Sequence, residues 1–381
     1  MTLALAVAGA AVGVGAAVSP ANAVSRANAA SPASAVTPAA AAPAALSGMA
    51  CRTVSDCMAV GANTPTMPTA LAAERWNGTK WSRVAMPHPA GTVNVTEAGV
   101  ACPAARECVA LGLAYPAKGP GPYAFAEYWD GTRWADGKAA TPGSASELTA
   151  ISCPTAASCY AVGQYTPKGK TTFTALIEHW NGKAWAQQAA PVPRGTTFSQ
   201  LNDVSCSQAS FCVAVGTDGS GLLIERWTGT GWTETARSGS AVAELWGVSC
   251  PATTSCYAVG GSGTATLALR WNGKTWSPVA APAPAGGSAP LLQSVSCVSA
   301  ARCLAVGDEL TPKVFADQWN GKAWKLLSVT TTGGHLGYFQ EVSCLGAASC
   351  VALGSISPIS AAWRSESAFW NGKSWKVVPT V

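Results

Sequence analysis

The fourteen cysteines are the residues of this chain whose spacing most directly indicates chemistry. They form seven pairs, each with five residues between its members, and no cysteine is left over. The pairs are Cys51/Cys57, Cys102/Cys108, Cys153/Cys159, Cys206/Cys212, Cys250/Cys256, Cys297/Cys303 and Cys344/Cys350. Such pairs form disulfides or ligate a metal, and a structural zinc site needs four nitrogen or sulfur ligands. The three histidines, His88, His179 and His335, do not recur with the cysteines, so we predict seven local disulfides and no metal site.

Carboxylate side chains offer a second kind of chemistry, and some of them recur. An acidic residue stands two places before a tryptophan in five repeats, as Glu74, Glu127, Glu178, Glu225 and Asp317. Their recurrence predicts a structural role, with each carboxylate paired to a local hydroxyl, amide or basic group. The acidic residues outside the repeat are Asp203, Asp218, Asp308, Glu309 and Glu341. Glycoside hydrolysis needs two carboxyl groups roughly 5 to 9.5 Å apart, so these become candidates only where the fold brings two of them together.

Aromatic residues outside the repeat are candidates for ligand binding. They are Tyr115, Tyr123, Tyr165, Trp246, Tyr338 and Trp363. For Trp246, a core position and a binding position are equally compatible with the sequence. Our binding candidates are Tyr115, Tyr123, Tyr165, Asp203, Asp308, Glu341 and Trp363. No serine or cysteine motif beside a histidine suggests a catalytic triad, and no glycine-rich phosphate loop precedes a helix, so we name no catalytic residue.

Paired tryptophans reveal the elements that must position these side chains. Each cysteine pair is followed by two tryptophans with four residues between them. The pairs are Trp76/Trp81, Trp129/Trp134, Trp180/Trp185, Trp227/Trp232, Trp271/Trp276, Trp319/Trp324 and Trp370/Trp375. First cysteines recur every 44 to 53 residues, and a period of that length indicates a repeat architecture.

Each repeat reads as four strands, which we name a to d. In the third repeat these are residues 148–153, 159–163, 174–180 and 183–185, separated by glycine, proline and asparagine. The first cysteine ends strand a and the second begins strand b, so a disulfide would join two neighbouring strands.

Two details of the packing can also be predicted. Strand b reads Cys-x-Ala-Val/Leu-Gly in all seven repeats, which places small residues on one face and larger residues on the other. We expect a tryptophan of the next repeat to cover the small face. Asn77-Gly78 is typical of a two-residue type I′ turn, which would put Trp76 opposite Thr79 and Glu74 opposite Trp81.

Sheets with one small and one large face bury themselves by stacking around an axis, as the blades of a propeller do. Seven complete units predict an all-β, seven-bladed β-propeller with four antiparallel strands and one disulfide in each blade. The a–b and c–d turns then share one face, and the more variable b–c and d–a loops share the other, where function usually resides.

The repeat Ser-Cys-x5-Cys-x-Ala-Val-Gly followed by Glu-x-Trp-Asn-Gly-Lys-x-Trp resembles that of secreted β-propeller-like repeat proteins of actinobacteria. The resemblance covers residues 45–381 and implies fold and export only. The Trp-Asn-Gly turn is similar in position to the Asp-box turn of sialidase-like propellers, a folding element that implies no catalysis. A looser likeness of 175–185 to the tryptophan-docking motif of quinoproteins lacks their adjacent cysteine pair, so we expect no cofactor.

The N-terminus predicts export. Residues 3–17 are apolar and precede Ala21-Asn22-Ala23, which predicts a signal peptide over 1–23, although no basic residue precedes the apolar run. The true start would then lie upstream, or the segment would be an uncleaved anchor. Residues 24–44 are rich in Ala, Pro and Ser and predict a linker, followed by the propeller over 45–381.

Composition narrows the class of partner. Charged residues make up 11% of the chain and the net charge is only +5, without the clustered basic stripe of a nucleic-acid-binding protein. We therefore predict a secreted monomer, outside the membrane once cleaved, that acts as a binding or scaffolding module for extracellular protein or carbohydrate. The alternative is a glycan-active hydrolase or lyase that uses carboxylates on the variable-loop face.

Overall fold

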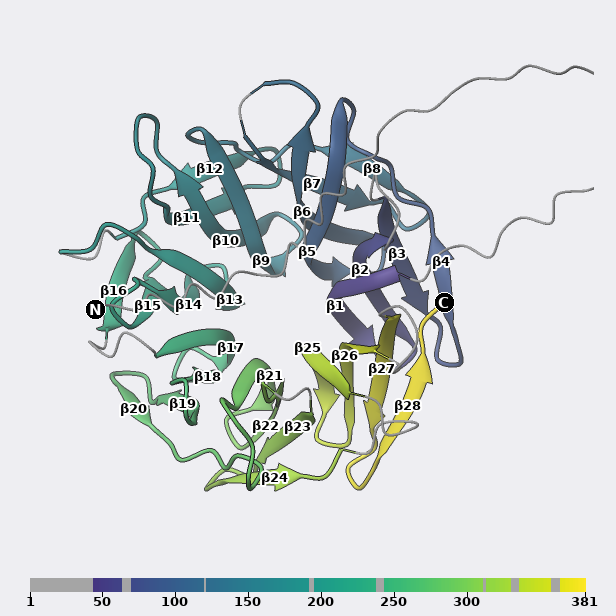
Figure 1. Cartoon of the computed structure of the whole chain (residues 1–381), viewed down its shortest axis with the longest axis vertical. Coiled ribbons are helices and arrows are strands. Elements are labelled where there is room, and N and C mark those ends of the chain that lie inside the picture. Colours follow the sequence, from purple (N-terminus) through teal and green to yellow (C-terminus); the bar gives the residue numbers. More distant parts are fainter. Residues whose placement is uncertain are drawn as a thin grey trace, which may run out of the picture. The chain divides into compact units, whose positions relative to one another are not determined.

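The computed structural model describes residues 44–63, 70–119, 121–191, 195–237, 243–310, 313–329, 336–357 and 364–381. Within them, seven four-stranded antiparallel sheets surround an axis (Figure 1), and each sheet contains consecutive strands of one repeat. The predicted seven-bladed β-propeller is therefore confirmed. This part of the chain contains no helix long and apolar enough to cross a membrane. Residues 1–43 lie outside the described residues, so the signal peptide and linker stay predictions.

The strands occupy the same four places in every blade, from the axis outwards. Strand a is β1 (Ala44–Thr53), β5 (Thr92–Ala104), β9 (Ala145–Thr155), β13 (Gln200–Gln208), β17 (Glu244–Ala252), β21 (Leu291–Ser299) or β25 (Leu336–Gly346). Strand b is β2 (Asp56–Asn63), β6 (Glu107–Pro116), β10 (Ser158–Thr166), β14 (Phe211–Thr217), β18 (Ser255–Gly261), β22 (Arg302–Asp308) or β26 (Ser349–Ser357). Strand c is β3 (Leu71–Trp76), β7 (Tyr123–Trp129), β11 (Thr174–Trp180), β15 (Leu222–Trp227), β19 (Thr266–Trp271), β23 (Val314–Trp319) or β27 (Arg364–Trp370). Strand d is β4 (Trp81–Val84), β8 (Trp134–Gly137), β12 (Trp185–Gln188), β16 (Trp232–Arg237), β20 (Trp276–Pro278), β24 (Trp324–Leu327) or β28 (Trp375–Pro379).

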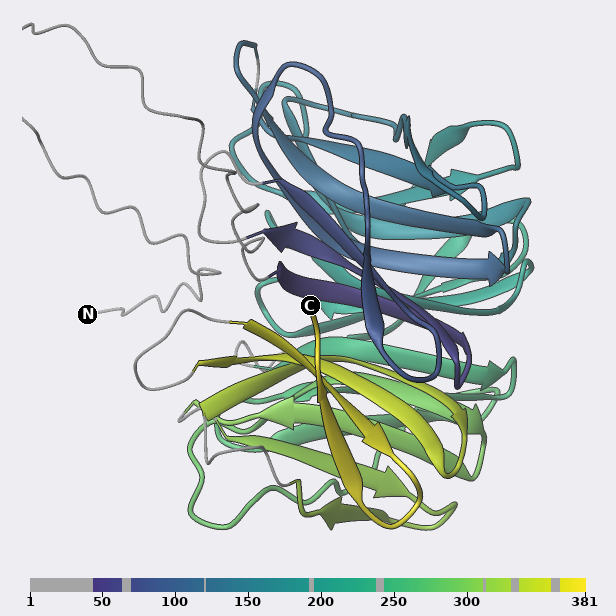
Figure 2. The same cartoon turned by 90° about the vertical axis from the view of Figure 1, so that its right-hand side faces the viewer.

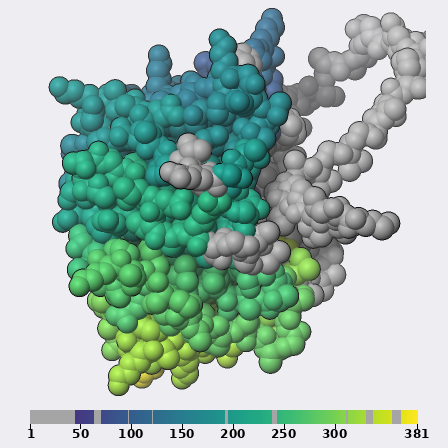
Figure 3. All heavy atoms as spheres, turned by 90° about the vertical axis from the view of Figure 1, so that its left-hand side faces the viewer, coloured from purple at the N-terminus to yellow at the C-terminus, as the bar shows by residue number. Residues whose placement is uncertain are grey.

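The a–b and c–d turns gather on one face of the ring, which we call the turn face. The b–c and d–a connections gather on the other, the variable-loop face, and Figure 2 shows the ring from the side. Seen from the left of Figure 1, the outer edges of the blades form a continuous teal and green surface (Figure 3).

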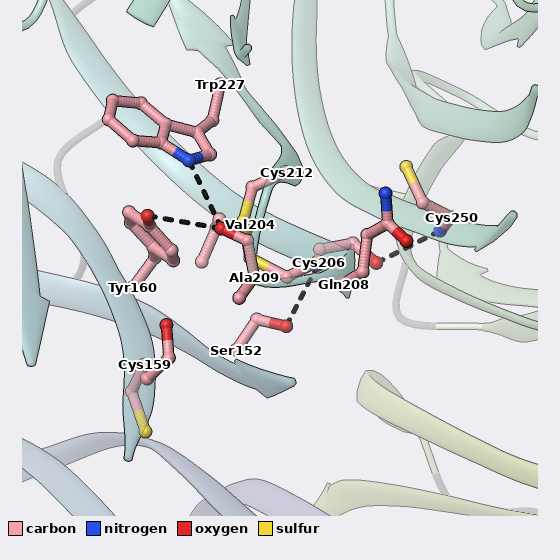
Figure 4. The surroundings of a disulfide bond; sticks show 12 residues. Ser152, Cys159, Tyr160, Val204, Cys206, Gln208, Ala209, Cys212, Trp227 and Cys250 are labelled. Carbon is pink, nitrogen blue, oxygen red and sulfur yellow. Dashed lines mark hydrogen bonds between the residues drawn. A yellow bond between two sulfur atoms is a disulfide. The ribbon is translucent and has the colours of Figure 1, made fainter. Parts of the chain in front are cut away.

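Each blade contains one disulfide across its a–b turn, as predicted. The bonded cysteines have Cα atoms 4.0 to 4.1 Å apart. In β13 and β14 the bonded pair Cys206 and Cys212 stand directly opposite each other (Figure 4). Two thiols at the end of one hairpin are close because of their spacing, which explains why this pairing is local. The seven bonds are Cys51–Cys57, Cys102–Cys108, Cys153–Cys159, Cys206–Cys212, Cys250–Cys256, Cys297–Cys303 and Cys344–Cys350.

The tryptophan hairpin has a different register from the predicted one. Trp76 pairs directly with Trp81, and Glu74 pairs with Arg83. The same Trp–Trp pairing recurs in the other six blades. The loop therefore contains four residues, 77–80, and the prediction of a two-residue turn is wrong.

The asparagine side chain explains the longer loop. Asn77 Oδ1 accepts hydrogen bonds from the N–H groups of Thr79 and Lys80, both at 3.0 Å. Gly78 adopts a positive φ of 94°, which a residue with a Cβ rarely does. Asparagine side chains commonly bond the backbone two residues on in this way, so Asn-Gly here stabilises a four-residue loop.

The tryptophans lie on the same face of their blade as the small residues, and the large face of the preceding blade covers that face, so the prediction that a tryptophan of the next repeat covers it is wrong. Cys212, Trp227 and Trp232 form one cross-strand row, and the two indole rings have centroids 5.9 Å apart. Both rings pack against Tyr160 of the preceding blade, with centroids 5.7 Å away. The large face of one blade thus meets the cysteine and tryptophan row of the next.

Serine hydroxyls link neighbouring inner strands. The serine before the first cysteine accepts a hydrogen bond from the N–H of the first cysteine in the next blade. The bonded pairs are Ser152–Cys206, Ser205–Cys250, Ser249–Cys297 and Ser296–Cys344, at 2.9 to 3.0 Å, and Figure 4 includes the first of them. The Ser-Cys dipeptide is therefore an inter-blade link as well as a disulfide position.

Side chains close the ring between blades 7 and 1, because each sheet is completed within one repeat. Trp81 Nε1–H donates to Ser367 Oγ at 2.9 Å. The Leu46 N–H donates to Ser365 Oγ at 2.6 Å. Both serines are buried, so water does not compete readily for these bonds.

Candidate functional site

A β-bulge in each inner strand directs one residue of every blade toward the axis. The register shifts by one residue between Leu201 and Asp203, and the other inner strands shift at the equivalent place. The bulge brings the backbone of strand a close to the neighbouring strand b. A Cβ added to Gly216 would lie 2.1 Å from the carbonyl oxygen of Gln200, which explains the glycine of the Cys-x-Ala-Val/Leu-Gly pattern.

These residues, third before the first cysteine, form a ring around the central channel. The ring consists of Gly48, Gly99, Ala150, Asp203, Gly247, Ser294 and Glu341. Neighbouring backbones are close here, since a Cβ on Gly48 would lie 2.8 Å from Gly99 Cα. The cavity that the inner strands enclose measures about 320 Å³. Asp203 and Glu341 are the two charged members of the ring.

Asp203 joins blades 4 and 5. Its Oδ1 accepts a hydrogen bond from the N–H of Val204, and its Oδ2 accepts one from the N–H of Val248 in β17, both at 2.7 Å. Burial raises the pKa of Asp203 to about 7, and the two N–H donors oppose that rise.

Glu341 joins blades 7 and 6. Its Oε1 accepts a hydrogen bond at 3.0 Å from the hydroxyl of Ser294, which itself accepts one from the N–H of Val342 at 3.2 Å. Burial raises the pKa of Glu341 to about 8, the charge of Asp203 adds to the rise, and the hydrogen bonds oppose it. The channel therefore contains two carboxyl groups that influence each other's ionisation.

The remaining acidic binding candidate, Asp308, is not part of the channel with Asp203 and Glu341. It lies at the end of β22, outside the residues that line the channel, and is 7% exposed. It accepts a hydrogen bond of 3.4 Å from Gln293, and burial raises its pKa to about 7. Asp218 forms an ion pair with Arg237 at 2.6 Å. Both are held within their own blades.

A second cavity lies on the variable-loop face where blade 2 meets blade 3. This inter-blade pocket measures about 420 Å³. It is lined by residues 116–118 and 121–125 of blade 2 and by segment 137–146, including Pro116, Lys118, Pro122, Tyr123, Lys138 and Pro142. Ser146 fastens its walls, because its hydroxyl accepts from the Ala124 N–H at 3.2 Å and its N–H donates to the Pro122 carbonyl at 3.1 Å.

Of the three predicted tyrosines, one lines this pocket and the other two lie next to lining residues. Tyr123 lines it, and Tyr115 is 38% exposed at the end of β6, beside the lining residue Pro116. Tyr165 lies close to the lining residue Gly143, since a Cβ added to Gly143 would be 3.1 Å from its ring. Trp363 lies outside the described residues, so its predicted role is untested.

The second cysteine of each disulfide, on strand b, belongs to the hydrophobic core. The second cysteine of each pair is at most 4% exposed, as Cys57, Cys108, Cys159, Cys212, Cys256, Cys303 and Cys350 show. Cys57, Cys108 and Cys256 belong to hydrophobic clusters that two neighbouring blades share, and they line neither the channel cavity nor the inter-blade pocket. The disulfides they form are those predicted. A ligand in either cavity would not contact these three cysteines.

The recurring acidic residues are fully buried, with 0% exposure in all five blades. Two accept hydrogen bonds from backbone N–H groups, but these come from the preceding blade and not from a local group as predicted. Glu74 accepts from the N–H of Val381 at 3.0 Å, and Glu178 accepts from the N–H of Ala140 at 2.9 Å. Within the described residues, the carboxyl oxygens of Glu127, Glu225 and Asp317 have no hydrogen-bond partner.

Proline explains this difference. Ala140 and Val381 each stand six residues after the second tryptophan of the preceding blade. For Glu127, Glu225 and Asp317 the residue at that position is Pro87, Pro191 and Pro282, and proline has no N–H to donate. Burial raises the pKa of both glutamates to about 8 and that of Asp317 to about 7, with nearby acidic charges adding to the rise for the glutamates.

Histidine and cysteine do not form a metal centre in the described residues, since no group of three or more His, Cys, Asp or Glu there could hold an ion. His179 stacks on Tyr160 with ring centroids 4.4 Å apart.

No family model matches the chain, and no curated protein matches it in sequence. Solved propeller structures do match. YCF48 from Cyanidioschyzon merolae has a TM-score of 0.52 at 13% identity, covering 82% of this chain and 93% of that chain. YCF48 bound to D1 peptide has a TM-score of 0.51 at 14% identity, over 82% and 91%. Virginiamycin B lyase from Staphylococcus aureus has a TM-score of 0.54 at 11% identity, over 81% and 90%. At these identities the similarity shows the fold alone.

Proposed function

We propose that this chain is an exported binding module that recognises a peptide segment of a protein partner at the inter-blade pocket. The observation that carries the proposal is a cavity of about 420 Å³ on the variable-loop face that Tyr123 lines, with Tyr115 and Tyr165 next to its lining residues Pro116 and Gly143. Tyrosines supply large contact areas with a polar tip, which suits recognition surfaces.

Two further observations support this proposal. Seven disulfides are typical of proteins in oxidising compartments, which agrees with the predicted signal peptide. A propeller of similar fold, YCF48, is described as bound to D1 peptide, and we carry a peptide ligand over from it as part of the proposal.

Screening of the full chain against a peptide array and a glycan array tests this function. We expect peptide capture that Tyr123→Ala abolishes and that Tyr338→Ala, in β25 of blade 7, leaves unchanged. Binding that both variants retain would place recognition elsewhere. Capture of glycans alone would refute the peptide ligand and indicate a carbohydrate ligand.

A second candidate is a glycan-active hydrolase or lyase, because Asp203 and Glu341 share the channel cavity. Their pKa values, raised to about 7 and about 8, allow one protonated and one ionised carboxyl at neutral pH, as acid and base roles require. Turnover of an oligosaccharide panel, lost in both Asp203→Asn and Glu341→Gln, would support this function. Absence of turnover by the wild-type protein would refute it.

A further inference from the structure

The b–c loops of blades 2 and 3 are alike in length and chemistry. The last paired residues before them are Ala114 with Tyr123 in blade 2 and Tyr165 with Thr174 in blade 3. Each loop contains a lysine directly before a glycine of positive φ, which is 110° at Gly119 and 77° at Gly169. Each loop also has aromatic residues near its ends. The equivalent loops of blades 4 and 5, residues 218–221 and 262–265, contain neither lysine nor aromatic residues.

The wall of the inter-blade pocket connects these two loops. The Ser144 N–H donates to the carbonyl of Thr166 at the start of the blade 3 loop, at 3.0 Å. On the other side, the Ala117 N–H donates to the carbonyl of Gly91 at 2.9 Å, which fastens the blade 2 loop. The two loops and the pocket therefore form one surface across neighbouring blades.

Positive charge dominates this surface. Lys118, Lys138, Lys168 and Lys170 are all exposed, and none forms an ion pair with a described residue. Two acidic residues are near these lysines in sequence, Asp136, which is exposed, and Glu147, which is partly buried. Asp136 stands opposite Glu127 in the β7–β8 pair, and Glu147 accepts a hydrogen bond from Gln164 at 3.0 Å.

Exposed aromatic side chains stand at the ends of the two lysine-containing loops, Tyr115 before Lys118 and Phe173 after Lys170. Tyr115 is 38% exposed and Phe173 is 39% exposed, which leaves much of each ring open to a ligand. Lysine ammonium groups bind carboxylates, and exposed rings bind apolar side chains.

We infer that the peptide recognised at the inter-blade pocket is an acidic one. Its carboxylates bind the lysines of the b–c loops of blades 2 and 3, and an apolar or aromatic residue enters the pocket. This inference rests on the proposed function and adds the chemical class of its ligand. Two positively charged loops on adjacent blades, with Lys118 in one and Lys168 and Lys170 in the other, suit an extended segment with several acidic residues, because each loop can then bind its own carboxylate.

Fluorescence anisotropy with labelled decapeptide pools tests the inference. One pool alternates Asp or Glu with aromatic and aliphatic residues, and a matched pool has Lys in place of the acids. We expect the full chain to bind the acidic pool more tightly and to lose affinity as salt rises, since exposed charges are screened over about 8 Å at physiological ionic strength.

The charge-reversal variant K118E/K168E should bind the acidic pool about tenfold more weakly, because two attractive contacts become repulsive. The control K322E/K373E makes the same change of charge at exposed c–d loops on the turn face and should leave binding unchanged. Equal losses in both variants would overturn the inference, because they would show an effect of net charge alone.

The remaining outcomes separate this inference from the proposed function. Binding of both pools with equal affinity, lost in Tyr123→Ala, would retain the peptide-binding function and refute the acidic class. Binding of tetragalacturonate in place of either pool would refute both and indicate an anionic glycan. Absence of binding by any probe would also refute both.

Discussion

Stability should fall as pH rises from 5 to 8, and Glu225 should account for a large part of the loss. This side chain is fully buried, and neither carboxyl oxygen has a hydrogen-bond partner within the described residues. Burial raises the pKa of Glu225 from 4.5 to about 8, and the charge of Glu234, its partner across β15 and β16, adds to the rise. Since the folded state binds this proton more tightly than the unfolded state, its stabilisation is complete below the unfolded pKa and is lost as pH passes through the folded pKa.

The size of the effect follows from the two pKa values. Each pH unit between them changes the free energy of unfolding by about 1.4 kcal/mol per group. With pKa values of 4.5 and about 8, the loss between pH 5 and pH 8 is about 3.5 kcal/mol, or about 2 kcal/mol where structural relaxation halves the shift. Glu127, Glu178 and Asp317, whose pKa values burial also raises, contribute with the same sign.

Glu225→Gln isolates this contribution, because the amide resembles the protonated acid and does not titrate. Urea denaturation at pH 5, 6, 7 and 8, with disulfides intact, measures it. We expect the variant to match the wild type near pH 5 and to exceed its free energy of unfolding by about 2 to 3.5 kcal/mol at pH 8. Glu107→Gln, at the exposed start of β6, is the control and should follow the wild-type curve. Parallel pH curves for Glu225→Gln and the wild type would refute the assignment of a buried, protonated acid.

Three further predictions concern the repeat. Trp185→Ala should lower the free energy of unfolding by about 3 to 5 kcal/mol, because the ring is 8% exposed and its N–H donates to Tyr128 at 2.7 Å; a loss below 1 kcal/mol in chemical denaturation would contradict this. Ser367→Ala should cost about 1 to 3 kcal/mol, since it removes the acceptor of Trp81 at the closure of the ring, and an unchanged denaturation midpoint would show that this bond does not stabilise the closure. Peptide mapping without reduction should recover cysteines linked only within each repeat, such as Cys153–Cys159, and any cross-repeat linkage would contradict the fold.

Much of the fold could be predicted from the chain because its determinants are local. Cysteines on either side of a short turn meet whatever the rest of the molecule does, so the disulfide of each blade follows from spacing. Alternating small and large residues on strand b predict a sheet with two unlike faces, and such sheets must stack. Seven copies of that unit therefore predict seven blades.

Details that depend on competing local bonds were less accessible. The Asn-Gly pair favours a two-residue turn when backbone preferences alone are considered. In the folded chain, the Asn77 side chain bonds two amides of a longer loop, and the direct pairing of Trp76 with Trp81 follows. In blade 4 this register also places both tryptophans in one row with Cys212, on the small face that the preceding blade covers.

Only the closed ring decided the candidate sites. Asp203 and Glu341 are far apart in the sequence, and they share a cavity because bulges in β13 and β25 turn both toward one axis. The inter-blade pocket likewise exists only where two blades meet. The sequence alone determines the residue types and their charges. Which residues of different repeats lie close together depends on how the blades stack around the axis, and only the tertiary structure determines that geometry.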